Sequence, residues 1–240
     1  MRLHRLLAGA ACLGLLAACG GGDGGPPPSV GGTPPPVGGT PLPVTHATDI
    51  ETKTDAAAFL RQAGFGGTED EVDALTGGSA VTWVQQQLAR SPRGYKANLA
   101  SRVSDNDSKF PQVSQLFYET LLGTDAELRA RMNFALSQLF VINGNEFFNE
   151  GRGLAEWLDT LDRNAFGNYR DLMDDVTRSP VMGKYLTYLN NKKGDPAKGR
   201  EPDENYAREV MQLFTIGLEE LYLDGSAKLD AQGNTIATYG

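Results

Sequence analysis

The stretch DENYAREVMQLFTIGL, from Asp203 to Leu218, separates polar from apolar residues in a pattern that decides the fold class. At about 100° per residue, its polar side chains fall in one arc of a helix and its apolar side chains, apart from Ile216, fall in the other. The polar arc holds Glu204, Asn205, Arg208, Glu209, Gln212 and Thr215. The same spacing recurs through nearly all of residues 49–240. The sequence therefore predicts a mainly α, multi-helix globular domain over this range.

The N-terminus has the layout of a secretory signal. Arg2 and Arg5 form a basic start, and a short apolar run follows from Leu6 to Cys19. That run is too short to span a bilayer as a permanent helix, but it matches the apolar region of a signal peptide. Residues 1–19 are therefore predicted to be a signal peptide, and the rest of the chain to be exported.

The end of this signal, Leu16-Ala17-Ala18-Cys19, resembles the lipobox of bacterial lipoproteins. In that class the cysteine is lipidated and becomes the first residue of the mature chain, so Cys19 is predicted to hold the protein on the membrane. An ordinary signal with a chance cysteine and a plain membrane anchor are the alternatives. Gly20, which stands where retained lipoproteins carry aspartate, favours the outer membrane if the host is Gram-negative.

Residues 20–48 read as a disordered tether. Between Gly20 and Thr45, seventeen of the twenty-six residues are glycine or proline, a composition that cannot form a packed core. Fully extended, such a segment reaches roughly 80 Å at about 3 Å per residue. It would hold the domain at 49–240 away from the membrane.

Composition excludes several kinds of chemistry from residues 49–240. The cysteines, Cys12 and Cys19, lie in the signal, and the histidines are His4 and His46. The domain therefore has no disulfide, no thiolate nucleophile, no Ser-His-Asp triad and no His-ligated zinc. No metal or cofactor is predicted.

The charge balance disfavours nucleic acid as a partner. The whole chain has a formal net charge of −8, and loss of Arg2 and Arg5 with the signal brings it to −10. An acidic body without a basic stripe is a poor phosphate binder. The predicted partners are the membrane, through Cys19, and an exported protein or an envelope polymer.

Capping residues mark several helix starts. Thr68 with Glu71 forms a capping-box pattern, and Ser79 and Asn168 are well placed as N-caps. We expect helices from Asp55, Glu69 and Ser79, two in 114–144 broken at Gly123, and three in 153–191 divided near Gly167 and Pro180. Residues 91–110 carry no clear pattern. The tail from Leu221 to Gly240 is predicted to be a hairpin or ordered loop, because Asp-Gly and Gln-Gly-Asn punctuate short apolar pieces.

Four segments of the sequence, taken in their order along the chain, resemble a bacterial family, the domain of unknown function 1800. The similarity is carried by AAFLRQAGFGGTEDEVDAL, LRARMNFALSQLFV, NAFGNYRDLMDDVTRSPVMGKYLTYLNN, and PDENYAREVMQLFTIGL with its following DGS and ATYG. Together they extend from Ala56 to Gly240. The resemblance implies an exported, largely α-helical bacterial protein, often encoded beside exported proteins of another uncharacterised family. It implies no particular activity.

Two departures from this family are visible. Its members usually continue well past the TYG at which this chain stops, so we expect a version shortened at its C-terminus. Many members carry a histidine in the segment that matches MQLFTIGL, where this chain has Phe214. A function that required that histidine would be missing here.

Arg129 is the most unusual charged residue, because it falls between Leu136 and Phe140 in the apolar arc of its helix. A guanidinium that faces a core needs acceptors. Either it reaches out at the helix end, or it pairs with a carboxylate from another helix. We predict an ion pair with Glu209, which lies at the edge of its own apolar arc.

The polar arc of Asp203–Leu218 allows two interpretations. Glu204–Arg208 and Asn205–Glu209 fit surface pairs at i,i+4 on an ordinary amphipathic helix. Alternatively, Asn205, Arg208 and Glu209 line a groove that binds a polar ligand.

Carboxylates offer the remaining chemistry. Asp171 lies where a negative charge stabilises the N-terminus of a helix, and Asp174 lies four residues from Arg170. The oxygen-rich tail residues Asp224, Ser226 and Asp230 make a calcium site a lesser alternative. The sequence favours a binding or assembly module at the cell envelope. The alternative is a carboxylate-dependent hydrolase of envelope polymer, with acids or bases drawn from Glu209, Asp203 and Asp175. A third interpretation is a shortened paralogue without function.

Overall fold

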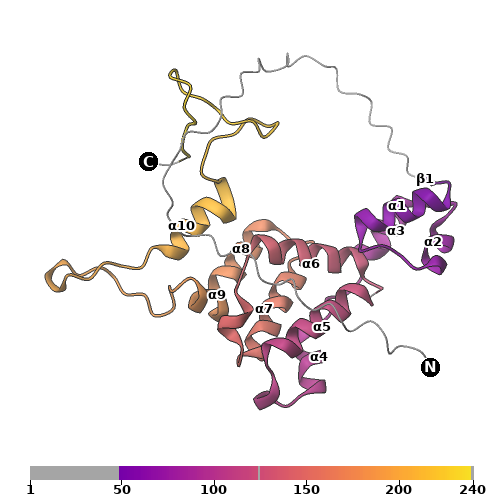
Figure 1. Cartoon of the computed structure of the whole chain (residues 1–240), viewed down its shortest axis with the longest axis horizontal. Coiled ribbons are helices and arrows are strands. Elements are labelled where there is room, and N and C mark those ends of the chain that lie inside the picture. Colours follow the sequence, from indigo (N-terminus) through magenta and orange to yellow (C-terminus); the bar gives the residue numbers. More distant parts are fainter. Residues whose placement is uncertain (1–48, 124, 239–240) are drawn as a thin grey trace. The chain divides into compact units, whose positions relative to one another are not determined.

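The computed structural model describes residues 49–123 and 125–238 (Figure 1). The predicted signal peptide, the lipidation site Cys19 and the tether lie outside the described residues. Within the described ranges, no helix has both the length and the apolar character needed to cross a bilayer.

The N-terminal helices pack around a small core of their own, made of Ile50, Ala56, Leu60 and Leu75. The elements are β1 (Asp49–Ile50), α1 (Lys53–Ala63), α2 (Glu69–Leu75), β2 (Gly78–Ser79) and α3 (Ala80–Leu88), and β1 pairs antiparallel with β2. The predicted capping box of Thr68 and Glu71 is confirmed, and Ser79 caps α3 by accepting a hydrogen bond from the Thr82 N–H. Local sequence therefore sets where these helices begin.

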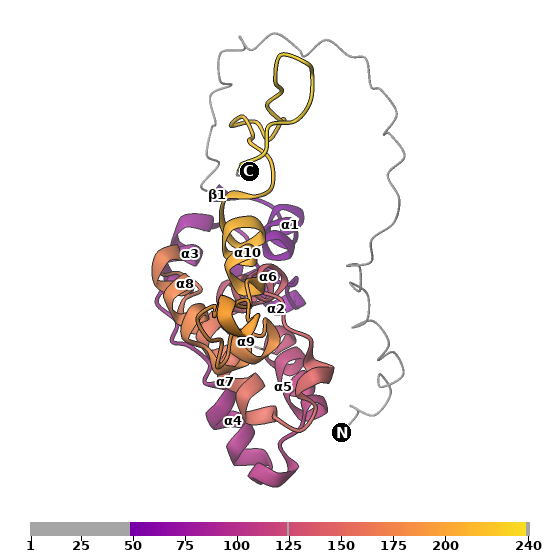
Figure 2. The ribbon, with the colours of Figure 1, turned by 90° about the vertical axis from the view of Figure 1, so that its left-hand side faces the viewer.

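A larger core lies among the middle helices, with α7 at its centre. These helices are α4 (Tyr95–Arg102), α5 (Phe110–Leu122), α6 (Glu127–Leu139), α7 (Gly151–Arg163), α8 (Tyr169–Arg178) and α9 (Pro180–Tyr185). Helix α7 contacts all five of the others, and Figures 1 and 2 show it among them. Its buried Trp157 and Leu161 join Phe140, Phe147 and Val176 in one hydrophobic cluster. Short 3₁₀ turns span Asp105–Asp107, Gly144–Phe147 and Pro196–Lys198.

The stretch from Asp203 to Leu218 is helical, as its spacing predicts, but the helix changes type midway. Helix α10 spans Asn205–Met211, and a π-helical turn continues through Gln212–Ile216. Tyr206 and Phe214 are buried. Leu213 and Leu218 belong to the predicted apolar arc and Ile216 does not, but all three are exposed.

The tail after this turn is an ordered run of turns with isolated bridges, Leu221 to Ala227 and Leu229 to Thr235. Its glycines Gly225 and Gly233 have positive φ, as tight turns of this kind require. The mainly α fold with an ordered, hairpin-like tail is confirmed for the described residues.

Candidate functional site

Arg129 is buried, with 6% of its surface exposed, but it does not pair with Glu209. Its Nε donates to the carbonyl oxygen of Arg90 at 3.1 Å, and its Nη1 donates to that of Asp162 at 2.6 Å. The guanidinium also lies over the ring of Phe166, 4.6 Å from the centroid. The predicted ion pair is therefore wrong.

The physical reason lies at the end of α7. The last carbonyls of a helix have no partner within it and carry the negative end of its dipole, so a buried cation finds its acceptors there. Asp162 belongs to that last turn. Arg129 therefore joins α6 to the end of α7 through hydrogen bonds to backbone carbonyls. Its positive charge also acts on the Asp162 carboxyl of α7, where it partly offsets the effect of burial on the pKa.

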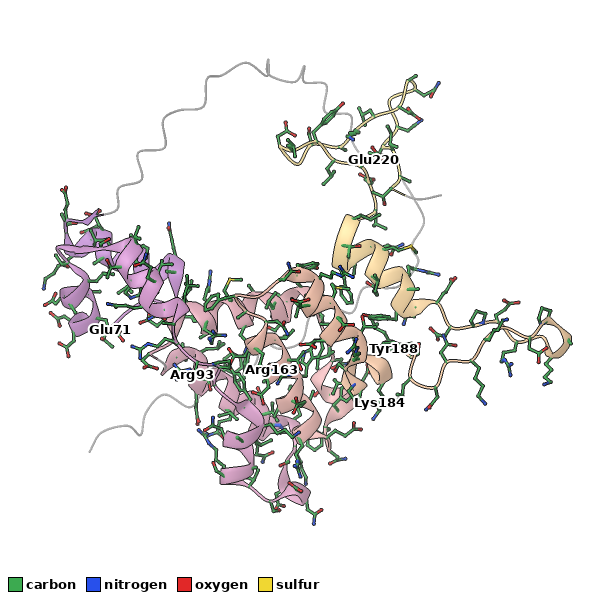
Figure 3. All side chains as sticks on the ribbon, turned by 180° about the vertical axis from the view of Figure 1, so that it is seen from behind. Glu71, Arg93, Arg163, Lys184, Tyr188 and Glu220 are labelled. Atoms are coloured by element: carbon green, nitrogen blue, oxygen red, sulfur yellow. The ribbon has the colours of Figure 1, made fainter. Side chains whose placement is uncertain are left out.

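Two buried aspartates on α7 fix the segment that leads into α4. Asp162 Oδ2 accepts from the Arg93 N–H at 2.6 Å, and Asp159 accepts from the N–H groups of Tyr95 at 2.5 Å and Lys96 at 3.0 Å. Figure 3 labels Arg93 and also Arg163, the last residue of α7. Burial raises the pKa of both carboxyls. Because backbone donors hold both oxygens of Asp159 and the Oδ2 atom of Asp162, we assign these residues a structural role, and Asp162 Oδ1 is buried without a hydrogen-bond partner among the described residues.

The groove predicted beside α10 exists only in part. Asn205 and Arg208 line an open recess of about 610 Å³ together with Glu201, Pro202, Asp203 and Glu204, and Glu209 is not among the lining residues. Arg208 pairs with Glu204 four residues earlier, as the surface interpretation expects. The carboxylate of Asp203 accepts from the Thr187 hydroxyl at 2.7 Å and the Asn205 N–H at 2.9 Å, and these bonds lower its pKa. The polar groups of this recess therefore largely satisfy one another.

The other carboxylates named from the sequence also have partners. Asp175 accepts from the Asn164 amide at 2.8 Å, and Asp174 pairs with Arg178 at 2.8 Å rather than with Arg170. In the tail, Asp224 accepts from the N–H and hydroxyl of Ser226, and Asp230 accepts from the N–H groups of Gln232 and Asn234. These bonds stabilise turns. Across residues 49–123 and 125–238, no group of three or more acidic, histidine or cysteine side chains is arranged to hold a metal.

A second cavity lies where α1, α2, α3 and α6 meet, and its lining carries acidic side chains without basic ones. It has a volume of about 290 Å³, and its polar and aromatic lining comes from Glu71, Ser79, Thr82, Trp83, Gln86 and Glu127. We call it the N-terminal cleft. Its lining contains two carboxylates and neither arginine nor lysine.

Glu127, in the first turn of α6, is the most perturbed group of the N-terminal cleft. Its Oε2 is buried and has no hydrogen-bond partner among the described residues. A Cβ atom at Gly64 would lie 2.9 Å from this oxygen and 3.1 Å from the Cβ of Glu127, so the backbone at Gly64 lies close against this side chain. Burial first, and then the negative charge of Glu71, raise the pKa of Glu127 to about 7.

Glu71 is held by the capping box of its own helix, and Trp83 packs against a residue of α1. Glu71 Oε2 accepts from the Thr68 N–H at 2.6 Å and its hydroxyl at 2.8 Å, and Figure 3 labels this side chain on α2. The indole of Trp83 packs edge-to-face against Phe59, with 5.1 Å between ring centroids. An acidic pair and an aromatic ring therefore border one cavity.

Sequence reasoning missed the N-terminal cleft. The capping-box pattern accounted for Glu71. The one available signal was the glycine series after α1, because closely spaced glycines mark positions where another element approaches the backbone.

Comparison with known families supports the resemblance seen in the sequence. The family model described as "Protein of unknown function (DUF1800)" matches residues 58–227, which is most of the chain. The chain belongs to the DUF1800 family. The DUF1800 match includes the N-terminal cleft residues Glu71, Trp83 and Glu127 as well as α10. No curated protein and no solved structure matches the chain.

Phe214, where the resemblance led us to expect a histidine in many DUF1800 members, is a core residue in this chain. It is 5% exposed, and its ring lies 4.9 Å from that of Phe140, centroid to centroid. The Tyr169 hydroxyl donates to its carbonyl oxygen. At this position the chain uses an aromatic packing residue.

Proposed function

We propose that this DUF1800 protein is exported, anchored by a lipid on Cys19, and acts at the cell envelope as a binding module for envelope polymer. The basic start, the short apolar run and the small residues before Cys19 support the anchor. The Gly/Pro-rich segment that follows supports a spacer. Gly20 supports an outer-membrane location in a Gram-negative host.

The observation that carries the binding role is the unpartnered carboxyl oxygen of Glu127 in the N-terminal cleft. A buried acceptor without a donor is costly, by about 1–3 kcal/mol. A ligand that donates to it recovers part of that free energy, while the indole of Trp83 offers apolar contact. None of the residues that line the α10 recess has a buried polar atom without a partner, and its Arg208 and Glu204 pair with each other.

The size of the N-terminal cleft favours a segment of polymer over a folded protein partner. At about 290 Å³ it is close to the lower end of small-ligand pockets. A stable protein interface instead covers a broad surface of about 1,200 Å² or more. An exported protein therefore remains the lesser of the two predicted partners.

Co-sedimentation of the full-length protein with purified, insoluble envelope polymer tests this function. Wild type is expected to sediment with the polymer, and Trp83→Leu is expected to bind at least about tenfold more weakly. The matched control is Tyr222→Leu, because Tyr222 is an exposed aromatic residue outside the cleft. Thermal melts establish that each variant is folded. Equal sedimentation of all three proteins would rule out the cleft as the binding site.

Hydrolysis of the bound polymer is a second candidate, favoured by the acids of the N-terminal cleft. Glycoside hydrolases pair one protonated and one ionised carboxyl across a cleft. Glu127, with its pKa near 7, suits the general acid, and Glu71 suits its partner. Asp203 and Asp175 do not line the N-terminal cleft, and Glu209 lines neither cavity.

Release of soluble fragments from the polymer separates binding from hydrolysis. If the protein is a hydrolase, wild type releases fragments, and Glu127→Gln binds the polymer but releases none. If wild type releases nothing on prolonged incubation, the protein is a binding module only.

A further inference from the structure

We infer that the N-terminal cleft binds a primary ammonium group of its ligand, held between the carboxylates of Glu71 and Glu127 and against the indole of Trp83. This inference rests on the proposed function and specifies the chemistry of the polymer: the bound segment carries a free amine.

The charge of the N-terminal cleft is the first reason. Glu127 is half-buried, and acidic side chains withdrawn from water are usually paired with cations. The lining adds a second carboxylate, the exposed Glu71, and no cation. Helix α3, which forms one wall, contains no charged residue at all. The ligand is the remaining source of positive charge.

The cations on neighbouring elements are directed elsewhere. Arg131, one turn after Glu127 on α6, lies over the ring of Phe65 at 5.2 Å from the centroid. Lys53 of α1 pairs with Asp73, and Arg61 of α1 is exposed. Within the described part of the chain, these groups leave Glu127 facing Glu71 as its charged neighbour.

The aromatic wall distinguishes an organic cation from a metal ion. Calcium takes six to eight oxygen ligands and magnesium about six in a tight octahedron, which two carboxylates and a few neutral side chains supply poorly. An alkyl ammonium instead gains from an aromatic ring, where cation–π attraction contributes about 0.5–2 kcal/mol. Its three N–H donors also match the acceptors of Glu71, Glu127 and Gln86.

Binding of an ammonium group is therefore coupled to loss of a proton. An adjacent positive charge favours the ionised form of Glu127 and lowers its pKa. At acidic pH the free cleft holds this proton and must release it to bind, so affinity rises as the pH increases towards about 7 and then levels off. The amine itself stays protonated throughout this range.

The two tryptophans of the chain provide a direct readout. Trp157 is buried in the larger core and Trp83 borders the N-terminal cleft, so Trp157→Phe leaves one reporter at the site. Cadaverine, added to the full-length Trp157→Phe protein at mildly alkaline pH and low salt, should change the emission saturably. Pentanediol, its uncharged analogue of equal length, should not. Calorimetry on wild type gives the same comparison if Trp157→Phe does not fold.

Substitution of the cleft acid and a change of pH complete this test. Glu127→Gln is expected to weaken cadaverine binding by about tenfold or more and to remove its pH dependence. Wild type is expected to bind about tenfold more weakly at acidic pH. An equal response to diamine and diol, or no response to either, overturns the inference. Tighter binding of an alkylguanidine than of cadaverine overturns the assignment to an ammonium group.

Polymer treated to acetylate its amines separates this inference from the proposed function. If native polymer binds and acetylated polymer does not, both hold. If both polymers bind equally and cadaverine does not compete, the polymer role holds and the ammonium site is overturned. If cadaverine binds and neither polymer does, the ammonium site holds and the polymer role is overturned.

Discussion

Glu127 and Arg129 share the first turn of α6, and both are partly or wholly withdrawn from water. Arg129 meets two backbone carbonyls, so its charge is satisfied inside the protein. Glu127 has a buried oxygen that meets no donor in the described chain. Arg129 is therefore a structural residue, whereas Glu127 has the unused hydrogen-bond acceptor expected of a binding residue.

Replacement of Arg129 should show its structural role. Arg129→Met leaves the carbonyl of Arg90 without its donor and removes one of the donors of the Asp162 carbonyl, so it is expected to lower the free energy of unfolding by about 2–4 kcal/mol. Arg131→Met is the matched control on the same helix, because Arg131 is exposed and makes only a ring contact. It should cost about 1 kcal/mol or less. Urea unfolding of both variants measures the difference, and equal losses would contradict the assigned role.

Whereas an acid paired with a cation makes a protein more stable as the pH rises, Glu127 should make this protein less stable as the pH rises. Its pKa is raised in the folded protein to about 7 from 4.5, so the folded state binds more protons between these values. Its stabilising contribution is therefore full at low pH and is lost as the pH rises through about 7. Relative to wild type, Glu127→Gln should gain about 1–2 kcal/mol between mildly acidic and mildly alkaline pH, discounted for partial exposure. A constant difference across this range would contradict the raised pKa.

At the scale of elements, the start of a helix was predictable where the capping side chain directly precedes the helix. The start of α4 was not, because its capping side chain comes from another helix. Thr68, Ser79 and Asn168 cap the helices that directly follow them, and their sequence patterns identified all three starts. Helix α4 lies in the region without a prediction, and no side chain of its own caps it. Its first N–H groups are bonded by Asp159 of α7, which no local pattern reveals.

This difference predicts where each cap acts. Asp159→Ala should lower hydrogen-exchange protection throughout α4 and cost about 2–4 kcal/mol, because it leaves two buried N–H donors unsatisfied. Asn168 accepts only from the Arg170 N–H, at 2.8 Å, so Asn168→Ala should cost about 1 kcal/mol and affect the start of α8. Hydrogen exchange followed by mass spectrometry distinguishes the two patterns. Unchanged protection in α4 would contradict the remote cap.

Helical periodicity predicted the secondary structure of Asp203–Leu218 better than it predicted burial. Tyr206 and Phe214 enter the larger core, but the π-helical turn at Gln212–Ile216 changes the phase of the side chains. Leu213 and Leu218 consequently face solvent, with 62% and 55% of their surfaces exposed. A wheel drawn at constant spacing has no means of showing this change.

For the whole molecule, composition and periodicity were sufficient for the fold class, and the order of motifs was sufficient for the family. The candidate site was not predictable, because Glu127 comes from α6, which lies far along the chain from the segment α1 to α3 that supplies the rest of the lining. Arg129 was correctly recognised as buried, but its partners are backbone carbonyls, which every residue carries and which therefore leave no sequence signal. Asn205 and Arg208 do share a recess, yet their charges and amides are bonded locally.

The proposed function depends first on Cys19, because a lipid there would keep the N-terminal cleft beside the envelope polymer. The most direct measurement is incorporation of radiolabelled palmitate in living cells by wild type, Cys19→Ala and Cys12→Ala. Cys12 is the matched control, since it is the other cysteine of the chain and lies within the predicted signal. We predict label in wild type and Cys12→Ala and none in Cys19→Ala. Equal label in Cys19→Ala and wild type, or no label in any of the three, would contradict a lipid-anchored protein.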